Sequence, residues 1–147
     1  MKAQTLVGRA RQLLDPQFAV AAVVALVVEI GLSISTVPRV TRLLGIRNVG
    51  DLEVMSAGAA VDVDWIRRRS TQVHRVFRRW PFGNTCLRRA LVLGQRIRRL
   101  DPLLVIGVRH DEAGRLLAHA WLVVGGTALD PMAAHYAPLR DVNVTTT

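Results

Sequence analysis

PFGNTCLRRA, residues 81–90, is the stretch in which a loop turns into a helix. Pro81 and Gly83 favour a loop, and either Asn84 or Thr85 is a good N-cap for the residues that follow. Apolar residues then recur at helical spacing, while arginines occupy the other sides. The stretch therefore predicts a helix with Cys86 in its first turn. The apolar positions are Leu87, Ala90, Leu91, Gly94 and Ile97.

Cys86 is the only cysteine of the chain, so it cannot form an internal disulfide. At the start of a helix, unpaired backbone N–H groups and the positive end of the helix dipole favour the reactive thiolate. The same N–H groups point toward a developing oxyanion. We therefore interpret Cys86 as a nucleophile, and the alternative is a small buried hydrophobic residue.

The pattern changes from helical to extended after Asp101 and Pro102. Apolar and β-branched residues then form runs that are separated by turn residues, which is typical of strands. Gly125 and Gly126 indicate a two-residue hairpin between the last two runs. The predicted strands are residues 103–109, 115–124 and 127–130.

The hairpin predicts a pair formed by His119 and Asp130. Counting outward from the two glycines places Trp121 opposite Asp130, and side chains two residues apart on a strand share a face. Asp130 then lies diagonal to His119 on that face. Diagonal neighbours are about 7–8 Å apart, a gap that an imidazole and a carboxylate can close with a hydrogen bond.

A thiol at a helix start and a histidine oriented by an aspartate are the parts of a cysteine nucleophile site. Their order, Cys86, His119 and Asp130, resembles the transglutaminase-like branch of the papain-type fold. Within that branch, three segments are similar to the leader peptidases of lasso-peptide biosynthesis, and the likeness spans residues 65–131. The segments are CLRRA (86–90), LVIGVR (104–109) and AHAW (118–121).

The resemblance implies an α+β fold in which helices pack on a small antiparallel sheet. We expect a helical, hydrophobic and basic N-terminal extension over residues 1–50, and a cysteine peptidase domain over residues 51–147. In the implied mechanism, Cys86 attacks the carbonyl, His119 takes the thiol proton and Asp130 orients the imidazole. Water then releases the thioester.

Four more residues are candidates for contacting the substrate or its oxyanion: Trp80, Asn84, Thr85 and Trp121. The other histidines, His74, His110 and His135, are interpreted as surface residues. No paired Cys or His spacing supports a metal site. The implied mechanism needs neither a metal nor an organic cofactor.

The resemblance also implies partners and a location. The substrate is a lasso precursor peptide, its leader is held by a separate recognition protein, and the core peptide passes to an ATP-dependent macrolactam synthetase. The expected location is the cytoplasm. Two other functions stay open: an acyltransferase or transglutaminase that uses the same triad, and a non-catalytic adaptor that binds the leader.

The chain is strongly basic, with a formal net charge of +9. Between Arg67 and Arg99 there are eleven arginines and no acidic residue. Such a surface suits nucleic acid, an anionic membrane or an acidic peptide, and the alternative is a basic face that only contacts solvent. No zinc finger, base-stacking motif or glycine-rich phosphate loop accompanies the charge, so nucleic acid ranks below peptide as a partner.

Residues 18–28 are an unbroken apolar run of eleven residues. A helix needs about 20 apolar residues to span a bilayer, so this run is too short unless Glu29 is also buried. Lys2, Arg9 and Arg11 before it give the outline of a signal peptide. We prefer a buried or partner-facing helix, and peripheral contact with a membrane stays open.

Two more helices are predicted before the cysteine. A short basic helix covers residues 39–46, and the boundary to the catalytic part is expected within residues 45–51. Residues 55–60 are expected to form a connecting turn or short helix. Asp62 or Asp64 then caps a helix whose buried stripe includes Ile66, Val73, Val76, Phe77 and Trp80.

Overall fold

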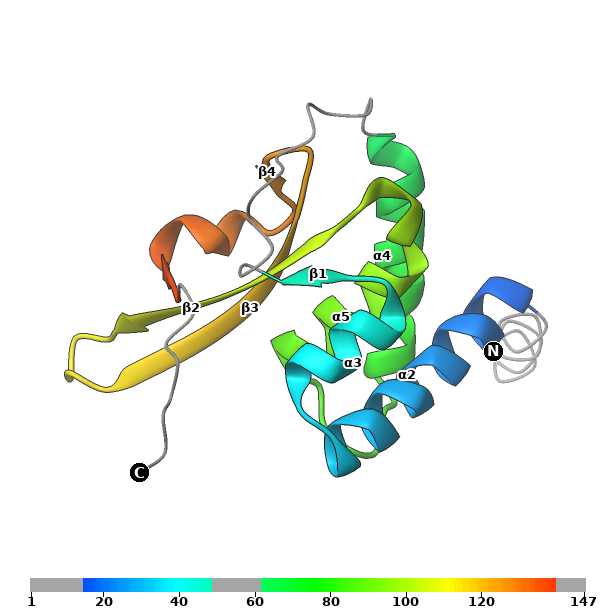
Figure 1. The fold of residues 1–147 in the computed structure, drawn as a ribbon, viewed down its shortest axis with the longest axis horizontal. Helices are drawn as coiled ribbons and strands as arrows, with labels where there is room; N and C mark the ends of the chain where they lie inside the picture. The colour runs from blue at the N-terminus through cyan, green and yellow to red at the C-terminus, as the bar shows by residue number, and fades with distance from the viewer. Residues whose placement is uncertain (1–14, 49–61, 140–147) are drawn as a thin grey trace, which may run out of the picture.

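The chain folds into helices packed on a small sheet, as the sequence predicts (Figure 1). The computed structural model describes residues 15–48 and 62–139. The helices in this part are α2 (Pro16–Ile34), α3 (Val37–Leu44), α4 (Val63–Phe77) and α5 (Cys86–Arg96), with 3-10 helices η2 (Arg98–Leu100) and η3 (Pro131–His135). The strands are β1 (Arg47–Asn48), β2 (Leu103–His110), β3 (Leu116–Val124), β4 (Thr127–Ala128) and β5 (Ala137–Pro138).

The sheet is built around a long antiparallel pair, β2 and β3. Its strand order is β1-β2-β3-β4, and β5 also pairs with β2. Val124 pairs with Thr127 and Val123 with Ala128, so the register counted from the two glycines is confirmed. The sheet as a whole is mixed, because β1 runs parallel to β2.

The last strand is shorter than predicted, and this changes the setting of Asp130. Regular pairing ends at Ala128, and one more hydrogen bond joins the Leu129 N–H to the Leu122 carbonyl. Pro131 has no N–H to donate to a ladder and suits the first turn of a helix. Asp130 therefore caps η3 instead of continuing β4.

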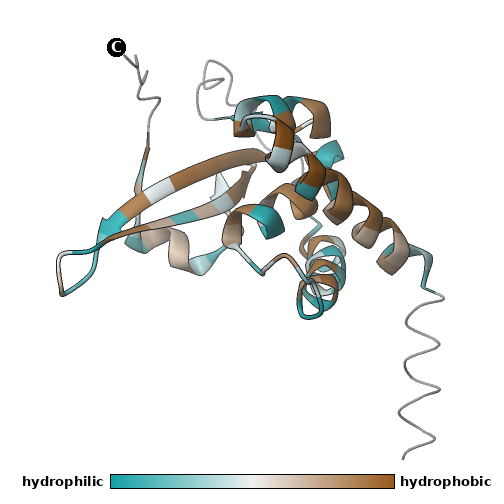
Figure 2. Ribbon diagram, turned by 90° about the horizontal axis from the view of Figure 1, so that it is seen from below, coloured by the Kyte–Doolittle hydropathy of each residue, from teal (hydrophilic) through white to brown (hydrophobic). Residues whose placement is uncertain are grey.

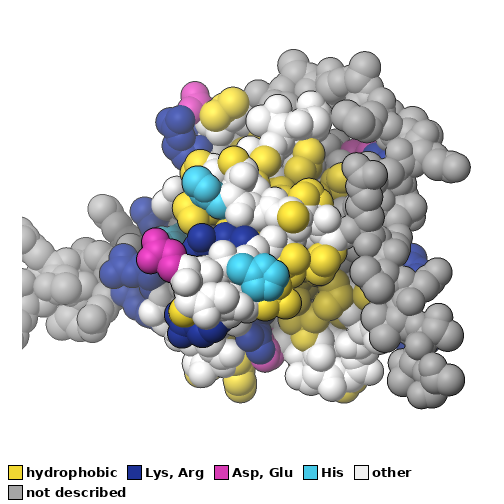
Figure 3. Space-filling model, turned by 90° about the vertical axis from the view of Figure 1, so that its left-hand side faces the viewer, with side chains coloured by type: hydrophobic (Ala, Val, Ile, Leu, Met, Phe, Trp, Pro, Cys, Tyr) yellow, Lys and Arg dark blue, Asp and Glu magenta, His cyan; other side chains and the backbone are white. Residues whose placement is uncertain are grey.

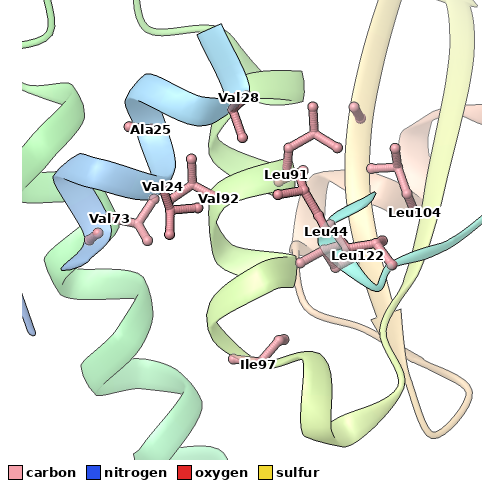
Figure 4. Close-up of a cluster of buried hydrophobic side chains, with 14 of the residues drawn as sticks. Val24, Ala25, Val28, Leu44, Val73, Leu91, Val92, Ile97, Leu104 and Leu122 are labelled. Carbon is pink, nitrogen blue, oxygen red and sulfur yellow. The ribbon is translucent and has the colours of Figure 1, made fainter. Parts of the chain in front are cut away.

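The main core lies between the helices and one face of the sheet (Figure 4). Helix α5 runs through its centre, and its residues Leu91 and Val92 are fully buried. Helix α2 contacts both α4 and α5. Its inner face adds Ala21, Ala25 and Val28, each at most 1% exposed. A smaller cluster on the other face of the sheet is formed by Val105, Trp121 and Ala133.

Sequence predictions for the earlier helices are largely confirmed. The short basic helix is α3, and the Asp62 side chain caps α4 by accepting the Trp65 N–H at 2.9 Å. The predicted stripe of α4 is buried, except that Trp80 lies beyond the helix end and is half-buried. The turn expected at residues 55–60 lies outside the described residues. So does the boundary between residues 50 and 51, which stays a prediction.

Helix α2 has an apolar inner face and an apolar outer face (Figure 2). The outer face exposes large side chains at a spacing of three and four residues: Val20, Val23, Val27, Ile30 and Ile34. By length and composition the helix is able to cross a membrane, a test that the core helix of a soluble protein also passes. Its inner face, however, is part of the core described above.

Candidate active site

The predicted nucleophile lies at the first residue of α5. Thr85 is the N-cap, and its hydroxyl accepts the Arg88 N–H at 3.3 Å. Cys86 is half-buried and packs against the edge of the main core. The helix start thus leaves the thiol partly accessible, next to the positive end of the helix dipole.

Histidine and aspartate form the predicted pair. The His119 Nε2 and Asp130 Oδ2 atoms are 2.8 Å apart. The other carboxylate oxygen, Oδ1, accepts the Met132 N–H at 2.8 Å. Asp130 is thereby held by the start of η3 while it holds the imidazole. Among the residues that the structure describes, Nδ1 of His119 has no hydrogen-bond partner, so it is the nitrogen available to exchange a proton.

An aromatic group fixes the plane of the His119 ring. The Trp121 ring stacks beside it at 5.9 Å between ring centroids, and the Tyr136 ring lies at 5.0 Å. The Arg109 guanidinium lies over the Tyr136 ring, 5.2 Å from its centroid. Because the Trp121 and Tyr136 rings lie against it, the His119 imidazole has little rotational freedom.

Gly107 explains why Trp121 fits at this place. Gly107 is the register partner of His119 on β2, and an added Cβ there would lie 2.6 Å from the Trp121 ring. The same Cβ would lie 2.9 Å from the Ala137 carbonyl oxygen of β5. Only glycine lets the indole ring and β5 approach the strand this closely.

Cys86 and Asp130 line one cavity of about 250 Å³. The cavity lies between the helices α4 and α5 and the end of the β3–β4 hairpin. Trp121 and Pro131 also line it. At this point β4 has ended, so in the described part of the chain the outer edge of β3 around Ala120 has no strand partner. Seen from the end that carries η3, the surface shows histidine and arginine side chains beside an apolar area (Figure 3).

The structure brings His119 to Asp130, but no hydrogen bond joins Cys86 to His119 within the described residues. The two are connected through Asp130, which lines the cysteine cavity and contacts the imidazole, whereas the Trp121 ring that stacks on His119 belongs to the cluster on the other face of the sheet. Hydrogen bonds between catalytic groups are often long before substrate binds and tighten in the complex. The structure therefore contains the His119–Asp130 pair, and Cys86 lines the same cavity as Asp130.

The four further candidates fall in different places. Trp121 lines the cysteine cavity, whereas Trp80 does not. The Trp80 N–H makes no hydrogen bond with any described residue, and the Trp80 ring packs against the main core. Thr85 is used as the helix cap, and Asn84 is exposed.

Backbone donors supply a better oxyanion candidate than these side chains. The N–H groups of Cys86 and Leu87 are free of hydrogen bonds to any described residue, because the Thr85 hydroxyl takes the Arg88 N–H instead. Donors at a helix start combine direct hydrogen bonding with the helix dipole. They lie beside the sulfur that would form the tetrahedral intermediate.

An ion pair ties the start of α5 to α2. Both Arg88 nitrogens Nε and Nη2 donate to the Glu29 carboxylate, at 2.7 and 2.8 Å. This hydrogen bonding holds the pKa of Glu29 below its ordinary value, and it raises the pKa of Arg88. Since Arg88 lies two residues after Cys86, the pair fixes the turn that carries the thiol.

Sequence reasoning did not find Tyr136 or the role of Gly107. His74, which the sequence places on the surface, is exposed but also lines the cysteine cavity. Tyr136 is the only tyrosine in the chain, but this does not indicate where in the fold it lies. Within residues 15–48 and 62–139, no group of three metal-binding side chains is placed to hold an ion.

Comparison with protein families identifies residues 25–141 as a match to the Transglutaminase-like superfamily. The match covers well over half of the chain, so the chain belongs to this superfamily. Its members are typically cysteine-dependent enzymes, which agrees with the thiol, imidazole and carboxylate found here. No curated protein and no solved structure matches the chain.

Proposed function

We propose that this chain is a cysteine peptidase that removes the leader from a lasso-peptide precursor. The observation that carries the proposal is the 2.8 Å contact between His119 Nε2 and Asp130 Oδ2 beside the cavity that Cys86 lines. Membership of the Transglutaminase-like superfamily supports a cysteine-dependent enzyme. The likeness of CLRRA, LVIGVR and AHAW to leader peptidases supports the particular substrate.

In the proposed mechanism the Cys86 sulfur attacks the carbonyl carbon of the scissile bond. His119 takes the thiol proton on Nδ1, since Asp130 occupies Nε2. The oxyanion is held by the N–H groups at the start of α5. When the C–N bond breaks, His119 gives its proton to the leaving amine and a thioester remains. Water, deprotonated by the same imidazole, then hydrolyses the thioester.

The proposal includes partners and a cellular place. A separate recognition protein would hold the leader, and an ATP-dependent macrolactam synthetase would receive the core peptide. These reactions belong in the cytoplasm, where the precursor is made. The described domain offers a long flexible peptide little surface besides its cavities, and ordering such a peptide costs free energy. Cleavage should therefore be faster when the recognition protein is present.

The test is to search the neighbouring genes for a short precursor and to follow its cleavage by mass spectrometry. Wild-type protein should give leader and core, and Cys86→Ala should give neither while its circular dichroism spectrum stays unchanged. Cleavage by folded Cys86→Ala would eliminate the mechanism. If an added amine, and not water, appears in the product, the enzyme is an acyltransferase that uses the same thioester. Leader binding without any turnover would indicate an adaptor.

A further inference from the structure

A second, larger cavity adjoins the one that contains Cys86. Its volume is about 710 Å³, and it lies between one face of α4 and the strand β4. Four residues line both cavities: Ser70, His74, Leu93 and Leu129. Because these walls are shared, the two cavities form one groove that leads from β4 to the thiol.

The floor of the larger cavity is apolar. It includes Ile66, which is buried, together with Leu93 and Leu129, which pack against the main core. The volume lies within the roughly 300–1,000 Å³ range that is usual for ligand pockets. Burying an apolar side chain on such a floor is favourable, because it removes apolar surface from water.

The walls of the groove are basic. Arg89 follows Cys86 by three residues, is half-buried, and makes no hydrogen bond or ion pair with any described residue. His74 adds an ionisable group, and Arg67 adds a positive charge that is already paired with Asp64 at 3.5 Å. Asp130 is the one acidic residue among the described lining residues, and its oxygens are taken by His119 and by the Met132 N–H. Among the lining residues, an acidic side chain would therefore find an unpaired cation at Arg89 and no free carboxylate.

We propose that this groove binds the substrate as an extended peptide, with a large apolar side chain in the larger cavity and an acidic side chain at Arg89. The inference rests on the proposed function for placing a peptide beside Cys86. It goes further by assigning the side-chain chemistry that the enzyme selects. Selection of this kind comes from an apolar site that rejects polar groups and a cation that rejects lysine.

Alkylation of Cys86 measures the binding of peptides without requiring turnover. One series of synthetic hexapeptides carries an N-terminal chloroacetyl group, and a second carries a C-terminal chloromethyl ketone, so the peptide extends from the thiol in either chain direction. The sulfur displaces chloride to form a thioether, and the thiol proton passes to the buffer. At each position in turn, Leu is compared with Ser, and Glu with Lys. Rates come from intact-protein mass spectrometry and are divided by the iodoacetamide rate.

We expect one position in one series at which Leu reacts about tenfold faster than Ser, and another at which Glu reacts about tenfold faster than Lys. A tenfold ratio corresponds to about 1.4 kcal/mol. Ser70→Trp fills the junction of the two cavities and should abolish the preference for Leu. Arg89→Glu should reverse the preference for Glu. The matched controls Arg68→Trp and Arg99→Glu, both at exposed positions outside the groove, should keep both preferences.

Equal relative rates for all peptides, within about twofold, would overturn the groove as the specificity site and would leave cleavage by Cys86 untouched. Conversely, clear Leu and Glu preferences in a protein that never cleaves the precursor would overturn the peptidase and keep the groove. If Ser70→Trp does not fold, Ala128→Trp makes the same test from the opposite wall, where Ala128 is exposed.

Discussion

Asp130 uses its two oxygens for two different purposes, so its role at His119 can be separated from its structural role. Oδ2 contacts the imidazole, while Oδ1 caps η3 through the Met132 N–H. An asparagine keeps an oxygen for the cap, and asparagine is as good an N-cap as aspartate. It replaces the other oxygen with an NH₂ group, which cannot accept a hydrogen bond from the imidazole N–H.

Asp130→Asn should therefore lower kcat/KM for precursor cleavage by roughly 10²–10⁴-fold, with a melting temperature near that of the wild type. His119→Ala should leave less activity still, because it removes the proton carrier itself. The control is Asp64→Asn, since the Asp64 side chain is 74% exposed and lies on α4. Equal activity of the two asparagine variants would show that Asp130 has no part in the reaction.

Gly107 should matter for activity more than for stability. Gly107→Val inserts a Cβ 2.6 Å from the Trp121 ring, so the ring must move and the stacked His119 must move with it. Overpacking of this kind costs about 1–3 kcal/mol of the free energy of unfolding. We expect a further loss of at least about tenfold in kcat at a temperature where the variant is fully folded.

The matched control for Gly107→Val is Ile106→Val on the same strand. Ile106 packs on the main core, on the other face of the sheet from Trp121. Removing its methylene costs about 0.5–1.5 kcal/mol. The control should unfold more easily and keep its kcat. If kcat fell equally in both variants, the close packing of Trp121 on Gly107 would have no catalytic role.

At the level of single residues, sequence predicts contacts that follow from local counting. His119 and Asp130 are eleven positions apart in the sequence and are joined by one hairpin. The two glycines that mark the turn were therefore enough to predict their contact. Tyr136 reaches His119 only because η3 folds back over the sheet. That return is decided by packing against Val105 and Trp121, and no local pattern encodes it.

Between elements, the ion pair of Glu29 on α2 with Arg88 on α5 should make stability depend on pH. Both side chains are largely buried, at 15% and 23% exposed. The hydrogen bonds from Arg88 lower the pKa of Glu29 in the folded state. A lowered pKa stabilises the folded protein above the unfolded value, about 4.3. This contribution is lost as the pH falls through the folded value.

Arg88→Met should lower the free energy of unfolding by about 1.5–3 kcal/mol at pH 7, because it leaves a carboxylate without its charged partner. The difference from the wild type should shrink as the pH falls, because Glu29 of the variant is protonated first, and it should be smallest below the lowered pKa of Glu29 in the wild type. Urea unfolding at pH 7, 5 and 3.5 measures it. Arg99→Met, at an exposed position, is the control. A difference that stayed constant with pH would mean that Arg88 acts through packing alone.

Long periodic elements were predictable, and short ones were not. Helices α4 and α5 begin where capping residues precede an apolar stripe, and the strands β2 and β3 follow their β-branched runs. By contrast, β1 and β5 have two residues each and exist because β2 offers them an edge. The 3-10 turn η3 forms where Pro131 stops the ladder. Such elements depend on their neighbours more than on their own sequence.

For the molecule as a whole, helix α2 decides whether the N-terminal part is an accessory or a component of the fold. Its inner face lies in the same core as α4, α5 and the sheet. Its outer face exposes Val23 to 61% and Ile34 to 79%. A single helix that crosses a membrane contacts lipid on all sides, whereas a core helix buries one face against the rest of the protein.

A pair of substitutions on α2 tests this directly. Ala25 is 1% exposed and Val23 is 61% exposed, two residues apart on the same helix. Ala25→Gln should lower the free energy of unfolding by about 2–5 kcal/mol, because an amide without partners enters the core together with extra volume. Val23→Gln should change it by less than about 0.5 kcal/mol and raise solubility. Similar effects of the two substitutions would mean that α2 is not packed on α5 in solution. In that case, deletion of residues 1–35 should leave a folded protein with a reactive Cys86. If α2 is packed on the core, we expect its removal to unfold the start of α5, because Glu29 and the core around Leu91 hold that turn in place.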